Sequence, residues 1–159
     1  MKDNNHQQFM QMAIDLAHKN VASGKGGPFG AVVAKNGKII ATAVNEVTST
    51  NDPTAHAEVV AIRRACASLH SHQLDGCIIY CSCEPCPMCL GAIYWSRPAK
   101  VYYAAKKEDA AASGFDDDFI YHEIDLPHPD RKIPFINIGR EESLKVFRFW
   151  DKSDLKIAY

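Results

Sequence analysis

The chain has 159 residues, 47% of them hydrophobic and 23% charged, and a formal net charge of −1. This length suits one domain with a sizeable core and is too short for two ordinary domains, so we expect a single domain over residues 1–159. The near-zero charge argues against electrostatic binding to a nucleic-acid backbone, and the sequence lacks an apolar leader or a membrane-length apolar run. We therefore expect a cytoplasmic protein that binds neither nucleic acid nor membrane.

An amphipathic helix is predicted over about residues 7–21, where apolar side chains recur at helical spacing and Gly24 follows. Residues 24–30 are rich in glycine but lack the Lys-Ser/Thr ending of a phosphate-binding loop. We interpret them as a turn that leads into a strand. Phe29 in this turn either faces a pocket or joins the core.

A β-hairpin is predicted after this turn. Residues 31–34 and 38–44 are apolar, and Asn36-Gly37 between them is the strongest short signal for a hairpin turn. Asn45 ends the second strand. Its side-chain amide either bonds a flat heterocycle or stabilises the local turn.

The second helix, predicted over about residues 55–69, begins in a segment with chemically reactive side chains. Asp52 and Pro53 precede the helix as a capping acid and an early proline. His56 is a candidate metal ligand at the helix start. Glu58 follows two residues later, so its side chain can point into the same cavity without being required as a ligand.

A central strand over residues 77–81 leads into the Pro-Cys-Pro-Met-Cys segment at residues 85–89, where a third helix is predicted to begin. His56, Cys86 and Cys89 supply the three protein ligands that are typical of catalytic zinc. Unpaired N–H groups and the dipole at a helix start favour thiolate over thiol, so both helix starts stabilise anionic ligands. We expect one zinc ion per subunit, with water or hydroxide as its fourth ligand.

Glu58 is a candidate proton carrier at this zinc site. Zinc lowers the pKa of its water to about 7, and a carboxylate beside it can pass the water's proton to a substrate. His-x-Glu and Pro-Cys-x-x-Cys together are the signature of zinc-dependent nucleobase deaminases, so we predict a hydrolase of this class. The alternative is a structural zinc clip closed by Cys83 as a fourth ligand, which leaves Glu58 without a role.

The remaining elements complete the predicted fold. A third helix over about residues 87–96 carries Tyr94 and Trp95, which are predicted to be core or dimer-interface aromatics, and residues 100–105 form a fourth strand. Strands alternating with helices after a hairpin predict a three-layer α/β/α domain, with a mixed sheet of about five strands and helices on both faces. The less regular remainder, beginning with three acids at residues 116–118, is expected to carry specificity.

Four stretches carry a family resemblance: Gly27-Pro28-Phe29-Gly30, Asn51–Glu58, Ser82–Trp95 and Gly114-Phe115-Asp116-Asp117. The chain resembles the short bacterial guanine deaminases of the cytidine-deaminase superfamily, from its first helix through about Tyr121 and again at Tyr159. The zinc signature is common to the superfamily, whereas the Gly-Phe-Asp-Asp stretch and the terminal tyrosine resemble guanine deaminases in particular. The resemblance implies a cytidine-deaminase-like fold.

The resemblance also implies roles for single residues. Phe29 would stack on a purine base, Asn45 would bond it, and Asp117 would approach its exocyclic amino group as a second proton carrier. Tyr159 would close the pocket. These residues would make a small purine base the substrate.

By the same resemblance we expect a homodimer in which the C-terminal segment, from about residue 125, is exchanged between subunits by domain swapping. Tyr159 would then act in the neighbouring subunit's site. The chain departs from its relatives in Asp118, a third acid, and in Cys81, where a threonine is common.

The expected reaction is hydrolysis of guanine to xanthine and ammonia, a step of purine catabolism. C2 of guanine is an amidine-like carbon, which zinc hydroxide can attack once Glu58 protonates the adjacent ring nitrogen, and Asp117 has a role in the departure of ammonia. The alternatives are a tRNA adenosine deaminase, whose polyanionic substrate the acids at 116–118 would repel, and a deaminase of guanosine or cytosine. A non-catalytic zinc module that binds nucleic acid is disfavoured by the neutral charge.

Overall fold

The computed structural model describes residues 3–157 and 159, which fall into two compact units, Met1–Asp118 and Phe119–Tyr159. The first unit contains the sheet and all of the candidate zinc ligands, and the second is helical and irregular. No helix in the described part of the chain is long and apolar enough to cross a membrane.

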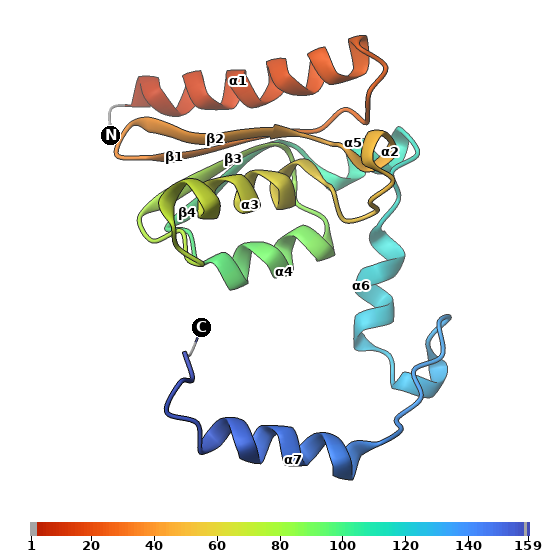
Figure 1. The fold of residues 1–159 in the computed structure, drawn as a ribbon. Coiled ribbons are helices and arrows are strands. Elements are labelled where there is room, and N and C mark those ends of the chain that lie inside the picture. The colour runs from red at the N-terminus through yellow and green to blue at the C-terminus, as the bar shows by residue number, and fades with distance from the viewer. Residues whose placement is uncertain (1–2, 158) are drawn as a thin grey trace. The chain divides into compact units, whose positions relative to one another are not determined.

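The first unit is built on a mixed sheet with the strand order β2-β1-β3-β4 (Figure 1). β1 runs antiparallel to β2 and to β3, whereas β4 runs parallel to β3. The strands are β1 (Gly30–Lys35), β2 (Lys38–Val44), β3 (Cys77–Cys83) and β4 (Lys100–Ala105).

The prediction of about five strands is wrong for the described residues, because this sheet has four. After β4 the chain enters α5 (Lys107–Ala112), whose start is fixed by a hydrogen bond from the backbone N–H of Lys106 to Asp109 Oδ2 (2.8 Å). The apolar run at residues 133–138 has strand-like composition, but Pro134 lacks the N–H that a ladder needs, and this run is irregular.

The hairpin between β1 and β2 confirms its sequence signal. Asn36 and Gly37 have φ angles of 51° and 76°. A two-residue type I′ turn requires a positive φ at both of its central positions, and asparagine followed by glycine meets that requirement at low cost. The turn sets the pairing of Lys35 with Lys38. A shift in register between Val33 and Ala34 then places Val44, at the end of β2, opposite Gly30, at the start of β1.

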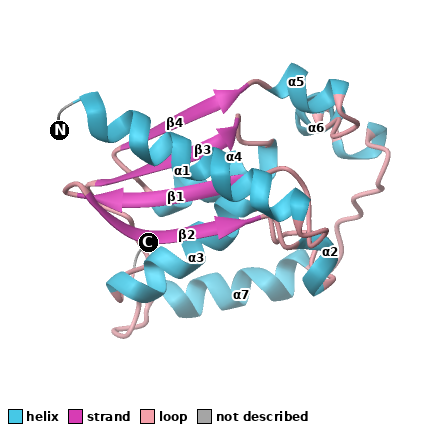
Figure 2. Cartoon of the chain, turned by 90° about the horizontal axis from the view of Figure 1, so that it is seen from above, coloured by secondary structure: helices cyan, strands magenta, loops and turns pink. Residues whose placement is uncertain are grey.

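Helices cover both faces of the sheet, which confirms the three-layer prediction (Figures 1 and 2). Side chains alternate along a strand, so β1 serves both layers. Val32 packs with α1 residues, and Val33 packs in the cluster that includes α3 residues. The helices of these layers are α1 (Asp3–Ala22), α3 (Ala57–Leu69) and α4 (Pro87–Ser96), and a short α2 (Val47–Thr50) precedes α3.

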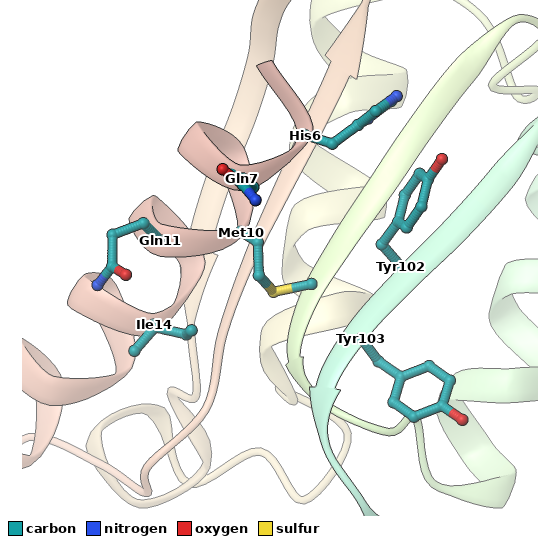
Figure 3. A pocket seen from close by; sticks show the side chains of 7 residues that line it. All are labelled: His6, Gln7, Met10, Gln11, Ile14, Tyr102 and Tyr103. Atoms are coloured by element: carbon teal, nitrogen blue, oxygen red, sulfur yellow. The ribbon is translucent and has the colours of Figure 1, made fainter. Parts of the chain in front are cut away.

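The N-terminal part of α1 is anchored to the strands through His6 (Figure 3). His6 Nδ1 lies 2.7 Å from the hydroxyl oxygen of Tyr80, a fully buried residue, and the His6 ring centroid lies 4.7 Å from that of Tyr102. A buried tyrosine hydroxyl needs a polar partner, and His6 supplies it. An open groove of about 500 Å³ runs beside this contact, between α1 and β4.

The outer side of α4 exposes large apolar side chains. The exposed fractions of Leu90, Tyr94 and Trp95 are 41%, 76% and 63%. This exposure shows that Tyr94 and Trp95 are not core residues. Their predicted alternative role, in a dimer interface, stays a prediction.

The second unit contains most of α6 (Asp118–Asp125), the 3₁₀ helix η1 (His128–Asp130) and α7 (Arg140–Asp151). None of the residues whose burial is described in this unit is buried. Ile136, Ile138 and Leu155 are 84%, 91% and 89% exposed. Folded monomers rarely expose so many large apolar side chains unless these side chains pack against another surface.

Candidate active site

His56, Cys86 and Cys89 form the one potential metal-binding group among the described residues. His56 Nδ1 lies 3.5 Å from the sulfur of Cys86 and 3.5 Å from that of Cys89, and the three ligand atoms all lie within 4.8 Å of one another. A tetrahedral zinc ion, with Zn–S bonds of about 2.3 Å and Zn–N bonds of about 2.0 Å, holds nitrogen and sulfur ligands about 3.5 Å apart. The geometry and the donor types therefore fit zinc.

Two helix starts present these ligands. His56 is the N-cap of α3, and Cys86 is the N-cap of α4, where its sulfur accepts a hydrogen bond from the backbone N–H of Cys89 (3.5 Å). Asp52 does not cap α3 as expected. Its carboxylate instead accepts hydrogen bonds from the N–H and hydroxyl of Thr54 (2.8 and 2.7 Å), because the chain turns once more before the helix begins at Ala57.

The two cysteines differ in their affinity for a proton. A hydrogen bond from the Cys89 thiol, together with His56 and the backbone N–H of Cys89, lowers the pKa of Cys86. The same hydrogen bond, followed by burial, raises the pKa of Cys89. Cys86 is therefore ready as a thiolate, and a metal ion must displace the Cys89 proton, as metals do when a thiol coordinates.

Cys83 does not join this group, although its spacing from Cys86 suggested a fourth ligand. Its thiol donates instead to the backbone carbonyl of Lys106, with a sulfur–oxygen distance of 3.6 Å. Burial is the main reason that the pKa of Cys83 is raised to about 11. Three ligands rather than four come together in the described residues, and this arrangement argues against a closed structural clip.

Glu58 lies beside the metal group. It is in the first turn of α3 and is only 6% exposed. Burial is the main cause that raises its pKa, and the charges of Cys86 and His56 also act on it. A buried carboxyl group with a raised pKa next to a metal group is suited to taking up and releasing protons.

Among the three consecutive acids, Asp117 is the one that interacts with the metal group. Burial, and then the charge of Cys86, raise the pKa of Asp117. The hydrogen bond with Cys86 is the main cause that raises the pKa of His56, and the charge of Asp117 contributes to it. Asp118 Oδ1 instead lies 3.2 Å from Lys107 Nζ, and Asp116 Oδ1 accepts a hydrogen bond from the backbone N–H of Asp118 (3.1 Å). The turn thus directs the three carboxylates to different partners.

The predicted base-binding residues lie near the ends of the hairpin strands. Asn45 directly follows β2, is 7% exposed, and accepts a hydrogen bond from the N–H of Val47 through Oδ1 (3.3 Å). The ring of Phe29 meets the ring of Phe115 edge to face, with centroids 5.0 Å apart and an interplanar angle of 87°. Phe115 belongs to the Gly-Phe-Asp-Asp stretch, but the sequence predicted no role for it.

Tyr159 belongs to the second unit, where its side chain is 70% exposed. Its role in closing a pocket stays a prediction. Sequence reasoning also missed Asn20, a buried polar residue near the end of α1 whose partners lie in other parts of the chain. A lone asparagine in an amphipathic helix carries no local signal for such a contact.

The fold and the metal group define a zinc-dependent deaminase. The model of the cytidine and deoxycytidylate deaminase zinc-binding region matches residues 3–105, and the chain belongs to this family. It is 59% identical to the guanine deaminase of Bacillus subtilis strain 168 over 146 residues, which are 92% of this chain and 94% of that protein. It is 41% identical to the tRNA-specific adenosine deaminase of Aquifex aeolicus over 109 residues, which are 67% and 72% of the two chains.

Solved structures agree with these relationships. The crystal structure of guanine deaminase from Bacillus subtilis matches with a TM-score of 0.94 and 56% identity, covering 97% of this chain and 98% of that one. A related protein solved in complex with 8-azaguanine matches with a TM-score of 0.68 and 35% identity, covering 70% and 64% of the two chains.

Proposed function

We propose that this protein hydrolyses guanine to xanthine and ammonia. One observation carries the proposal: the likeness to a guanine deaminase covers 92% of the chain, well beyond the zinc-binding region at residues 3–105. The likeness to a tRNA-specific adenosine deaminase covers 67%. The zinc region is common to both activities, so the higher identity to the guanine deaminase, 59% against 41%, kept over the additional length, is what favours guanine.

His56, Cys86 and Cys89 would hold one zinc ion per chain and leave a fourth position for water. Zinc held in this way lowers the pKa of that water to about 7 and so makes a nucleophile available at neutral pH. The three ligands that come together, and the different partner of Cys83, support an open site of this kind.

Glu58 moves the protons of the first step. As the water oxygen forms its bond to C2 of guanine, the Glu58 carboxylate takes the water's proton and delivers it to the adjacent ring nitrogen. Its burial beside the metal group supports this role, because burial raises the pKa of the Glu58 carboxyl group and a carboxyl group with a raised pKa holds a transferred proton more readily. No proton is lost to solvent in this transfer.

Asp117 assists the second step. The bond between C2 and the exocyclic nitrogen breaks, and the amine takes up a proton and leaves as ammonia. The C2 hydroxyl gives its remaining proton to the Glu58 carboxylate and becomes the new carbonyl of xanthine. The raised pKa of Asp117, caused mainly by burial, supports its role as the donor of that proton.

Phe29, Asn45 and Tyr159 would hold the base. Phe29 would stack on the purine while the edge-to-face contact with Phe115 keeps its ring oriented. The Asn45 amide would hydrogen-bond the ring edge, and Tyr159 would close the pocket.

The whole chain would act as one domain within a homodimer, in which the segment after about residue 125 is exchanged between subunits. The exposed apolar side chains of the second unit, including Ile136, Ile138 and Leu155, support its packing against another surface. Consumption of guanine by such an enzyme would serve purine catabolism.

The test is release of ammonia by the purified zinc protein from guanine, guanosine, adenine, cytosine and cytidine, with a tRNA anticodon stem-loop as an additional substrate. We expect release from guanine and formation of xanthine. Turnover of the stem-loop in place of guanine would identify the tRNA deaminase alternative. Inertness toward every substrate at full zinc occupancy would refute catalysis altogether.

A further inference from the structure

Asn20, near the C-terminal end of α1, joins two backbone segments that are distant in sequence. Its side chain is buried, and its Nδ2 lies 2.9 Å from the carbonyl oxygen of Gly27 and 2.9 Å from that of Asn45. Both partners are acceptors, so the amide nitrogen uses its two protons as donors. A buried amide whose two donors are both satisfied holds its partners in a defined position.

These contacts belong to a closed ring of hydrogen bonds. The N–H of Phe29 donates to the Gly27 carbonyl (2.9 Å), and the N–H of Asn45 donates to the Phe29 carbonyl (3.0 Å). Asn20 closes the ring by donating to both Gly27 and Asn45. We call these four residues, Asn20, Gly27, Phe29 and Asn45, the Asn20 ring.

The glycine turn is shaped to fit this ring. A Cβ atom on Gly26 would collide with the carbonyl oxygen of Asn45 and lie 2.8 Å from Asn20 Nδ2. A Cβ atom on Gly27 would make ordinary contacts instead, 3.4 Å from the Phe29 ring and 3.6 Å from Asn45 Cγ. Glycine is therefore required at position 26, because the backbone there lies directly against the Asn45 carbonyl. Gly27 instead leaves room beside the side chains of Phe29 and Asn45, the two residues proposed to bind the base.

We propose that Asn20 is a positioning residue, which sets the relative placement of Phe29 and Asn45 for binding of the base. The inference rests on the proposed function, because it concerns the two residues proposed to hold guanine. Asn20 acts through the backbone of both residues and does not touch the base. Because α1 is also anchored at its other end by His6 and Tyr80, the helix provides a fixed support for the ring.

Loss of Asn20 affects binding more than chemistry. Phe29 and Asn45 contact the base in the ground state and in the transition state alike, and loss of such uniform binding raises KM and leaves kcat nearly unchanged. The metal ligands and Glu58 belong to α3 and α4, outside the ring. We expect a KM for guanine that is roughly tenfold higher, which corresponds to a loss of about 1.4 kcal/mol of binding free energy.

The experiment compares Asn20→Asp, Asn20→Ser and Gly26→Ala with the wild-type zinc protein. Asn20→Asp keeps the shape of the side chain but places a carboxylate against two carbonyl oxygens, and Asn20→Ser keeps one short donor. Gly26→Ala leaves Asn20 in place and adds a Cβ atom that collides with the carbonyl oxygen of Asn45. For each variant the measurements are zinc content, kcat and KM for guanine, and the inhibition constant of xanthine. We expect KM and the xanthine constant to rise together, kcat to change by less than about threefold, and zinc to stay bound.

Phe9→Leu is the matched control. Phe9 is also a buried α1 residue, but it packs against Val32 and Tyr80 and takes no part in the ring. We expect this change to lower Tm without raising KM. An equal rise in KM for Phe9→Leu would assign the effect to general loosening of α1 and overturn the proposal.

Other results would also overturn the proposal: unchanged KM in the Asn20 variants, a loss of kcat with KM unchanged, or failure of all three variants to fold with zinc. The last result would assign Asn20 to folding. If the wild-type protein were inactive on guanine, the proposed function would be wrong, but the role of Asn20 would not yet be tested. The same KM comparison, made on whichever base the enzyme does deaminate, would then still decide the role of Asn20.

Discussion

The metal side of the site and the proposed base-binding side are built in different ways. The metal side takes its ligands from two short segments, and each segment is the start of a helix. The base-binding side takes Phe29, Asn45 and Phe115 from separate parts of the chain and joins them by backbone hydrogen bonds and ring contacts. The metal side is therefore encoded locally, whereas the base-binding side depends on the completed fold.

Removal of a metal ligand should have the largest effect. Cys86→Ala leaves two ligands and removes the thiolate with the lowered pKa, so we expect zinc to fall to background and deamination to become undetectable. Metal analysis and ammonia release measure the two effects. Cys66→Ala is the control, because Cys66 is a half-buried α3 residue outside the metal group and its loss should leave zinc and activity in place. Retention of stoichiometric zinc by Cys86→Ala would contradict the assignment.

Glu58→Gln should separate chemistry from metal binding. The amide keeps the size of the side chain but cannot carry a proton, so we expect kcat to fall by roughly 100- to 10,000-fold while zinc stays bound. Steady-state kinetics and metal analysis on the same sample test this. Should zinc and activity be lost together, Glu58 would be a support of the metal side and not a proton carrier.

The sequence predicts the metal side better than it predicts the base-binding side. The hairpin, the helices that begin near His56 and Cys86, and the three ligands follow from turn chemistry, apolar periodicity and ligand spacing, all of which act within a few residues. The capping role of Asp52 was predicted wrongly, because its carboxylate binds Thr54 instead. For Phe29 and for Asn45 the sequence left two roles open, and only the family resemblance favoured contact with a base. The contact between Asn20 and Asn45 spans 25 residues, and no local pattern anticipates a bond of that length.

The error in the strand count lies outside the assigned segments. Four segments of the sequence carry strand signals, and these four form the sheet of the described residues, whereas no segment was assigned to a fifth strand. The three acids show the limit of composition. Composition alone treats Asp116, Asp117 and Asp118 alike, whereas the turn gives each of them a different partner.

Asp117 and Asp118 are adjacent carboxylates, and replacing each of them in turn tests whether Asp117 alone serves the reaction. We expect Asp117→Asn to lower kcat by roughly 10- to 100-fold, because the leaving amine loses a proton donor. Asp118→Asn should change kcat by less than about twofold, since the ion pair of its carboxylate with Lys107 is exposed to solvent and such pairs contribute little. Measurement of kcat for both variants at equal zinc occupancy tests this difference. Equal losses from the two changes would mean that the local charge matters and that no single carboxylate does.

Phe115→Leu should have a smaller effect than Asp117→Asn, and it acts on the base-binding side alone. The edge-to-face contact with Phe29 is of a kind that contributes about 0.5–1.5 kcal/mol, which corresponds to a rise in KM for guanine of roughly 2- to 12-fold. Phe29→Leu removes the proposed stacking surface itself, so its KM should rise further than that of Phe115→Leu. In both variants kcat and zinc content should stay near the wild-type values, because neither ring belongs to the metal group. A kcat loss in Phe115→Leu as large as in Asp117→Asn would show that Phe115 serves the chemistry of the neighbouring acid, and the division between the two sides would not hold there.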